Sequence, residues 1–159
     1  MPISATDLAH LRTCLDLAAE ALAAGDEPFG SVLVDAAGAV RRAERNHVGG
    51  GDHTRHPELA LARWAAAHLT PEDRAAATVY TSGEHCPMCA AAHAWVGLGR
   101  IVYAASSAQL GAWLAEWGVP EGPVDCRPIH DIAPRVPVDG PVPELAAEVR
   151  ALHRRRFPR

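Results

Sequence analysis

Apolar residues recur at helical spacing along much of the chain. From residue 4 to residue 24, leucine and alanine return every three or four positions, and Gly25 follows the end of this stripe. Similar stripes predict four further helices, at about 57–69, 87–98, 106–117 and 142–155. Pro57 and Pro87 suit first helical positions, because the N–H that proline lacks would have no partner there.

Short apolar runs between these stripes predict five strands, at 29–35, 40–46, 77–81, 100–105 and 127–132. The second run follows a turn at residues 36–39 and carries three arginines, which is typical of a strand at a sheet edge. The order strand, helix, strand from residue 77 to residue 105 predicts a right-handed unit with parallel strands. We therefore expect one α/β domain over residues 1–159.

Composition and charge restrict the partners of this domain. The formal net charge is −4, from 15 basic and 19 acidic residues, so we expect no broad basic surface for nucleic acid. No apolar run reaches the roughly 18 residues of a membrane span, and the N-terminus lacks a secretory pattern. We therefore expect a cytoplasmic protein. Its four cysteines favour thiols and metal ligation over disulfides, with Cys14 and Cys126 as buried small side chains.

The remaining two cysteines carry the candidate chemistry. Cys86 and Cys89 stand three residues apart, so on a helix their side chains project from one face. With His56 they supply three zinc ligands, and a helix start favours their thiolate forms. A catalytic zinc keeps its fourth position for water. The alternatives are a redox pair or a structural zinc with a fourth ligand from His53, His85 or His93.

Glu58 follows His56 by two residues, so both side chains can reach one site from a helix start. Zinc lowers the pKa of bound water toward neutrality, and a carboxylate beside it can carry protons. This pattern predicts hydrolytic deamination, in which zinc-bound hydroxide attacks an amine-bearing ring carbon. Glu58 would take the proton of the water, deliver it to the ring nitrogen and then help ammonia to leave.

Four segments give the chain a family resemblance: Pro28-Phe29-Gly30, Asn46, residues 52–58 and Cys86-Pro87-Met88-Cys89. Through most of residues 5–117 it resembles the cytidine deaminase superfamily, in the branch of guanine, fungal-type cytosine and tRNA adenosine deaminases. The resemblance implies a three-layer fold with a five-stranded mixed sheet sandwiched by helices. It also implies a homodimer with one zinc per subunit, held by His56, Cys86 and Cys89, with Glu58 as proton shuttle.

The resemblance also implies substrate contacts, from Asn46 to the ring and from Phe29 along the base pocket. His85 stands where the family usually has proline, and Pro57 stands where it has alanine. We expect His85 to contact the substrate and help to select the ring; the alternative is a solvent-facing loop histidine. Trp95 is expected to stack on a flat heterocycle, whereas Trp113 and Trp117 fit a core or dimer stripe better.

The segment from Cys86 to Trp95 looks most like the guanine deaminase group. We therefore expect zinc-dependent deamination of a free nucleobase or related amino-heterocycle, such as guanine, cytosine or a triazine. One alternative is a tRNA adenosine-to-inosine deaminase, which the arginine-rich C-terminus would suit. A second alternative is a non-catalytic module that zinc stabilises.

Overall fold

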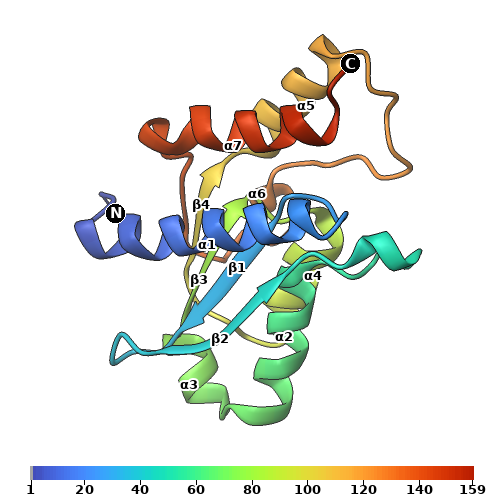
Figure 1. The fold of residues 1–159 in the computed structure, drawn as a ribbon. Helices are drawn as coiled ribbons and strands as arrows, with labels where there is room; N and C mark the ends of the chain where they lie inside the picture. The colour runs from blue at the N-terminus through green and yellow to red at the C-terminus, as the bar shows by residue number, and fades with distance from the viewer. Residues whose placement is uncertain (1) are drawn as a thin grey trace.

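Five strands form one sheet in the order β2-β1-β3-β4-β5 (Figure 1). The computed structural model describes residues 2–159. The strands are Gly30–Val34 (β1), Val40–Arg45 (β2), Thr78–Gly83 (β3), Ile101–Ala105 (β4) and Val138–Asp139 (β5). β1 pairs antiparallel with both β2 and β3, whereas β3 with β4 and β4 with β5 are parallel. The sheet is therefore mixed and five-stranded, which confirms the predicted fold class, and β3 and β4 are parallel as predicted.

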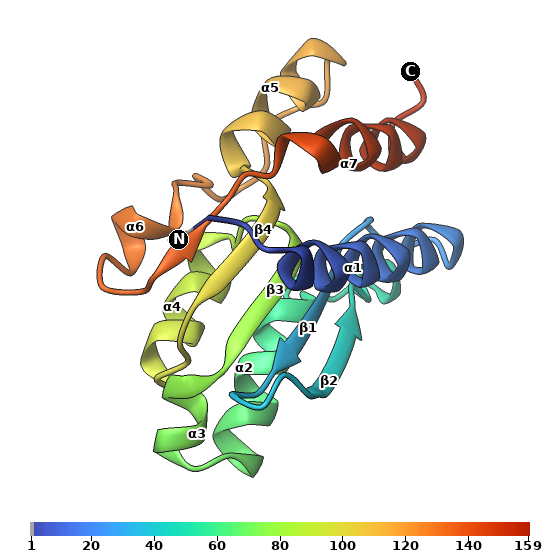
Figure 2. The same cartoon turned by 90° about the vertical axis from the view of Figure 1, so that its left-hand side faces the viewer.

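Helices cover both faces of this sheet (Figures 1 and 2). α1 (Ala5–Ala23) and α7 (Pro143–Arg156) lie on one face, and α2 (Pro57–His68) and α4 (Pro87–Trp95) lie on the other. The shorter helical segments surround these layers: η1 (Val48–Gly50), α3 (Pro71–Ala76), α5 (Ser107–Glu116) and α6 (Ile129–Ile132). Within residues 2–159, no helix combines the length and apolar character that a membrane crossing requires.

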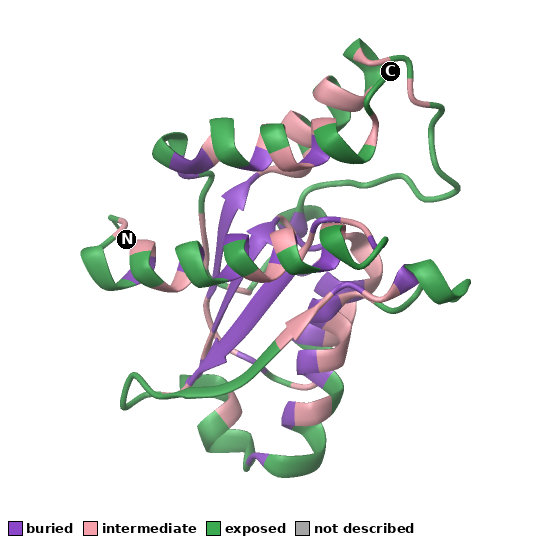
Figure 3. Cartoon of the chain, viewed as in Figure 1, coloured by how far each residue is buried: buried purple, intermediate pink, exposed green. Residues whose placement is uncertain are grey.

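Successive side chains along each strand point to opposite faces of the sheet, because the side-chain period of a strand is two residues. Val32, Tyr80 and Val102 pack in the core beneath α1 and α7. Leu33 and Val79 point the other way, into the cluster with α2. The interior strands β1 and β4, on either side of β3, are buried along their whole length (Figure 3). By the same alternation, residues 31 and 81 face α2.

The strand predicted at 127–132 is wrong, because residues 129–132 form the single helical turn α6. Its first free N–H, that of Ile129, donates to the Glu84 carboxylate at 2.8 Å, and the Ala133 N–H closes the turn on the Ile129 carbonyl. The fifth strand is β5, which pairs with β4 instead. A partner distant in sequence therefore decided the state of this short segment.

Helix boundaries differ from prediction at two other places. Residues 71–76 form the additional helix α3, because the Thr70 hydroxyl accepts a hydrogen bond from the Asp73 N–H and Pro71 opens the first turn. α4 ends at Trp95, three residues before the predicted end, because Gly97 takes a left-handed backbone with φ of 76°.

Candidate metal centre

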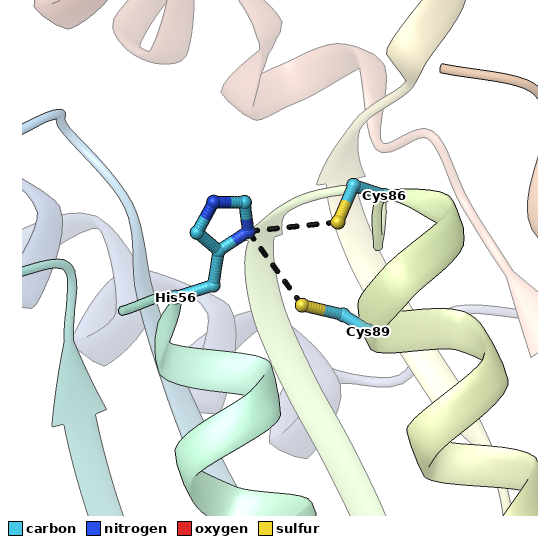
Figure 4. Close-up of side chains that lie close together, drawn as sticks. All are labelled: His56, Cys86 and Cys89. Carbon is cyan, nitrogen blue, oxygen red and sulfur yellow. Dashed lines mark hydrogen bonds between the residues drawn. The ribbon is translucent and has the colours of Figure 1, made fainter. Parts of the chain in front are cut away.

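Three side chains from two helix starts converge beside the sheet (Figure 4). His56 is the residue immediately before α2, Cys86 is the residue immediately before α4, and Cys89 lies in the first turn of α4. The Nδ1 atom of His56 lies 3.5 Å from Cys86 Sγ and 3.6 Å from Cys89 Sγ. The structure therefore brings the three predicted ligands together.

Their spacing fits a tetrahedral zinc ion. Zn–S bonds of about 2.3 Å and Zn–N bonds of about 2.0 Å at a tetrahedral angle place the ligand atoms roughly 3.6 Å apart. Among the residues that the structure describes, no further His, Cys, Asp or Glu joins the cluster. His53, His85 and His93 therefore supply no fourth ligand in this arrangement. Three ligands and one position for water are the pattern of a catalytic zinc site.

Electrostatics within the cluster prepare one thiolate. A hydrogen bond from Cys89, together with His56, lowers the pKa of Cys86 to about 4 against the opposing effect of burial. The same hydrogen bond, burial and the nearby Glu58 charge raise the pKa of Cys89. The contact with Cys86 raises the pKa of His56 to about 9. Without metal, the protons of the cluster thus reside on Cys89 and His56.

Glu58 lies in the first turn of α2, and its side chain is buried beside this cluster. Burial raises the pKa of its carboxyl group, while the charge of His56 and a hydrogen bond from Thr81 oppose that effect. Its Oε1 atom accepts hydrogen bonds from Thr81 Oγ1 at 2.9 Å and Ser31 Oγ at 3.1 Å. The Glu58 carboxyl group also contributes to the raised pKa of Cys89, so it lies close to a zinc ligand.

Asn46 is buried, and the structure fixes the direction of its amide. Its Oδ1 atom accepts from the Val48 N–H at 3.0 Å and from the Glu27 N–H at 3.3 Å. The backbone N–H of Asn46 donates to the Phe29 carbonyl at 3.0 Å. Within residues 2–159 its Nδ2 atom has no hydrogen-bond partner. The NH₂ group is therefore a buried donor whose acceptor is not among the described residues.

Phe29 lies against Gly83 at the end of β3, where an added Cβ atom would come within 3.0 Å of the Phe29 ring. Its ring also meets the ring of His153 edge-on, with centroids 5.0 Å apart. A small cavity is lined by Phe29, Gly83, Glu84 and His153, among others. His153 of α7 thus packs against Phe29.

The two other predicted substrate residues, His85 and Trp95, differ in burial. His85 is buried, and its ring packs at right angles to that of His93 with centroids 5.4 Å apart. The solvent-facing alternative for His85 is therefore wrong. Trp95 is 89% exposed at the far end of α4, about 9 Å along the helix axis from Cys89 at 1.5 Å per residue. The structure does not bring Trp95 to the metal ligands, because a rigid helix separates them.

Of the other aromatic and cysteine predictions, those for Trp113 and Cys14 are confirmed and that for Cys126 is wrong. Trp113 packs against the core, as expected for a core stripe. Cys14 is buried as predicted, but Cys126 is exposed in the loop before α6, so its predicted burial is wrong. Proline and glycine make this loop irregular, which leaves Cys126 without an apolar layer to enter.

Sequence reasoning missed three polar residues that shape the centre. Ser31 and Thr81 contact Glu58, and the only sequence signal was their alternation with the apolar residues of β1 and β3. Glu84 accepts hydrogen bonds from the Ser107 N–H at 2.9 Å and from the Ile129 N–H at 2.8 Å. It therefore ties the segment before Cys86 to the starts of α5 and α6.

A family model described as the cytidine and deoxycytidylate deaminase zinc-binding region matches residues 4–105. A "Probable cytosine deaminase" of Schizosaccharomyces pombe is 34% identical over 108 residues, covering 68% of this chain and 65% of that protein. A guanine deaminase of Bacillus subtilis is 33% identical over 96 residues, covering 60% of this chain and 62% of that protein. A tRNA-specific adenosine deaminase of Haemophilus influenzae is 34% identical over 110 residues, covering 64% of this chain and 60% of that protein.

The matched part of the chain thus spans less than two thirds of each of these relatives. Among solved structures, that of an NE0047 mutant in complex with 8-azaguanine is similar with a TM-score of 0.74 and 25% identity. The match covers 98% of this chain and 86% of that one. The fold similarity therefore extends well beyond residue 105, through α5 and α7.

Proposed function

The chain belongs to the cytidine and deoxycytidylate deaminase family of zinc-binding proteins, and we propose that it deaminates a free nucleobase or a related amino-heterocycle by hydrolysis. Water replaces the exocyclic amine of the ring, and ammonia leaves. The observation that carries this proposal is the buried Glu58 carboxyl group beside three ligands whose spacing fits zinc. A structural zinc would have no use for that carboxyl group. We also propose that residues 1–159 form one deaminase domain.

His56, Cys86 and Cys89 would hold the zinc, which supplies a water molecule activated at neutral pH. Glu58 would accept a proton from this water and pass it to the ring nitrogen next to the reacting carbon. It would then carry the second proton to the departing amine. Burial raises the pKa of Glu58, which suits a carboxyl group that must both accept and release protons near neutrality.

Asn46 would orient the ring. Because two backbone N–H groups occupy its Oδ1 atom, its Nδ2 atom can donate to a ring nitrogen or carbonyl oxygen of the substrate. Phe29 would line the pocket on the side where His153 of α7 packs against it. Guanine and cytosine are the first candidates, because relatives with those names share the matched region.

The tRNA alternative keeps the support of a relative with that name. Contacts of the C-terminal arginines favour a small base instead. Arg150 and Arg154 lie over the Trp117 ring at 5.4 and 5.2 Å, and Arg150 also pairs with Glu116. Arginines engaged within the chain are less available to phosphate, and the net charge is −4. The predicted homodimer and cytoplasmic location stay predictions.

An ammonia-release assay on the zinc-loaded protein tests the proposal. The panel contains guanine, cytosine, adenine, an aminotriazine and a tRNA anticodon arm with adenosine. We expect release from at least one free base and none from the RNA. Release from the RNA alone would establish the tRNA alternative. Release from none of them would overturn the proposed function.

A further inference from the structure

Two hydroxyl groups of the sheet hold one oxygen of Glu58. Ser31 on β1 and Thr81 on β3 stand opposite each other in the strand register, and their oxygens lie 2.8 Å apart. Both side chains are fully buried. Each hydroxyl also lies within hydrogen-bond distance of Glu58 Oε1, and Thr81 Oγ1 lies 3.0 Å from the Gly83 carbonyl.

Apolar side chains flank these hydroxyls along the two strands. Their neighbours on the same face of β1 and β3 are Leu33 and Val79, which pack against α2. A buried hydroxyl without a partner costs roughly 1–3 kcal/mol, so each must be satisfied locally. Within residues 2–159, the hydrogen bonds of the pair go to each other, to Glu58 and to the Gly83 carbonyl. The pair therefore contributes chiefly to the position of Glu58.

The hydrogens of the pair can be followed one by one. Ser31 donates its hydrogen to Thr81 or to Glu58, and Thr81 donates its hydrogen to Glu58 or to Gly83. An ionised carboxylate favours the arrangements in which at least one hydroxyl donates to Oε1, because charge-assisted hydrogen bonds are the stronger ones. Both hydroxyls lie within hydrogen-bond distance of Oε1, and within residues 2–159 no hydrogen bond from either one reaches Oε2.

We propose that Ser31 and Thr81 are positioning residues that occupy Oε1 of Glu58 and so reserve Oε2 for proton transfer. This inference rests on the proposed deamination. The proton leaves the attacking water for Oε2 and passes from Oε2 to the ring nitrogen. A second proton follows the same route to the amine, which departs as ammonia. Neither hydroxyl contacts the substrate; both act by preventing rotation of the carboxyl group.

The test compares variants that keep or remove a hydroxyl without changing much else. Thr81→Val keeps the shape of the side chain and removes the hydroxyl, whereas Thr81→Ser keeps the hydroxyl. Ser31→Ala removes the other donor. We expect kcat for the best base to fall about 10-fold in Thr81→Val and Ser31→Ala, because a misdirected catalytic group costs rate and not binding. KM and zinc content should stay within about twofold of wild type, and Thr81→Ser should keep most of the activity.

Glu58→Gln provides the matched background. In that background Thr81→Val should change the residual rate no further, whereas a general loss of order would lower the rate in both backgrounds. The inference is overturned if both hydroxyl-free variants keep wild-type kcat, or if Thr81→Ser loses as much as Thr81→Val. If one variant fails to fold, the other decides. A wild-type protein that releases ammonia from no base would instead overturn the proposed function.

Discussion

At the level of single residues, His56, Cys86 and Cys89 are placed to hold a metal ion. Without metal, the lowered pKa of Cys86 favours its thiolate form. The pKa of Cys89 is raised, and that of His56 is raised to about 9, so both groups hold protons that zinc must displace. Between pH 6 and 8, binding should therefore release about two protons. The apparent affinity should rise about 100-fold for each pH unit. Chelator competition at pH 6.5, 7.0 and 7.5 measures this, and a pH-independent affinity would show that the protons lie elsewhere.

Glu58 should be separable from the ligands by substitution. Glu58→Gln removes the proton carrier and keeps the side-chain shape, so we expect kcat to fall at least about 1,000-fold while zinc content stays at one per chain. Cys89→Ser is the matched control, because loss of a thiolate ligand should lower zinc content. Metal analysis and ammonia release together test this expectation. Unchanged activity in Glu58→Gln would contradict its role.

Asn46 offers a substitution that removes a donor and spares the loop. Asn46→Asp keeps an oxygen for the Val48 and Glu27 N–H groups but loses the NH₂ donor. We expect KM to rise at least about 10-fold for a base with a ring acceptor, because that acceptor then faces a carboxylate. Steady-state kinetics at unchanged zinc content measure the effect. An unchanged KM would mean that the amide does not contact the substrate.

At the level of elements, one buried carboxylate joins α1 to the sheet. Asp7 forms a capping box with Ser4, accepts from the Tyr80 hydroxyl at 2.7 Å and pairs with Arg100 on the strand side at 3.0 Å. Burial tends to raise the pKa of Asp7, but Arg100 and the hydrogen bonds from Ser4 and Tyr80 outweigh it and hold the pKa well below its usual value. Asp7 therefore stabilises the folded protein as an anion.

Asp7→Asn should lower the free energy of unfolding by about 3 kcal/mol, because the partly buried guanidinium group of Arg100 loses the negative charge of Asp7. Urea denaturation of the zinc-loaded protein measures this. Arg12→Gln is the control, since its pair with Glu148 is exposed and should contribute less than about 1 kcal/mol. Equal effects of the two substitutions would show that Asp7 contributes little to stability.

At the level of the whole molecule, buried neutral histidines should make stability depend on pH. Burial lowers the pKa of His153 to about 4, below its ordinary value of 6.5, and His93 behaves in the same way. Between these values the unfolded chain binds more protons than the folded one, so stability is full above pH 6.5 and falls toward pH 4. Each histidine should account for about 2 kcal/mol of the loss between pH 7.5 and pH 5.

His153→Leu isolates one of these contributions, because His153 contacts Phe29 and lies outside the metal ligands. The free energy of unfolding should fall less steeply with decreasing pH in this variant than in wild type, by about 2 kcal/mol at pH 5. Denaturation curves of both proteins at pH 7.5 and 5 give the difference. Identical slopes would mean that folding does not lower the pKa of His153.

The sequence by itself determined the three-ligand pattern and the α/β architecture. Both depend on local spacing. Two thiols three residues apart share a helix face, and apolar residues at helical spacing form one face that packs into the core. The helices at 5–23, 57–68 and 143–156 therefore begin and end close to their predicted bounds. The identity of Glu58 as a candidate proton carrier came from the same short-range pattern.

Only the tertiary structure decided the surroundings of that pattern. Ser31, Glu58 and Thr81 come from three elements separated by more than 20 residues, and strand register with helix packing joins them. Likewise, the buried His85 ring lies against that of His93, and the Glu84 carboxylate accepts from the first N–H of the helix at residues 129–132. Such contacts leave no periodic signal, because each joins one residue to another that is distant along the chain. The ligands could be read locally, whereas the hydrogen bonds that hold Oε1 of Glu58 depend on the whole fold.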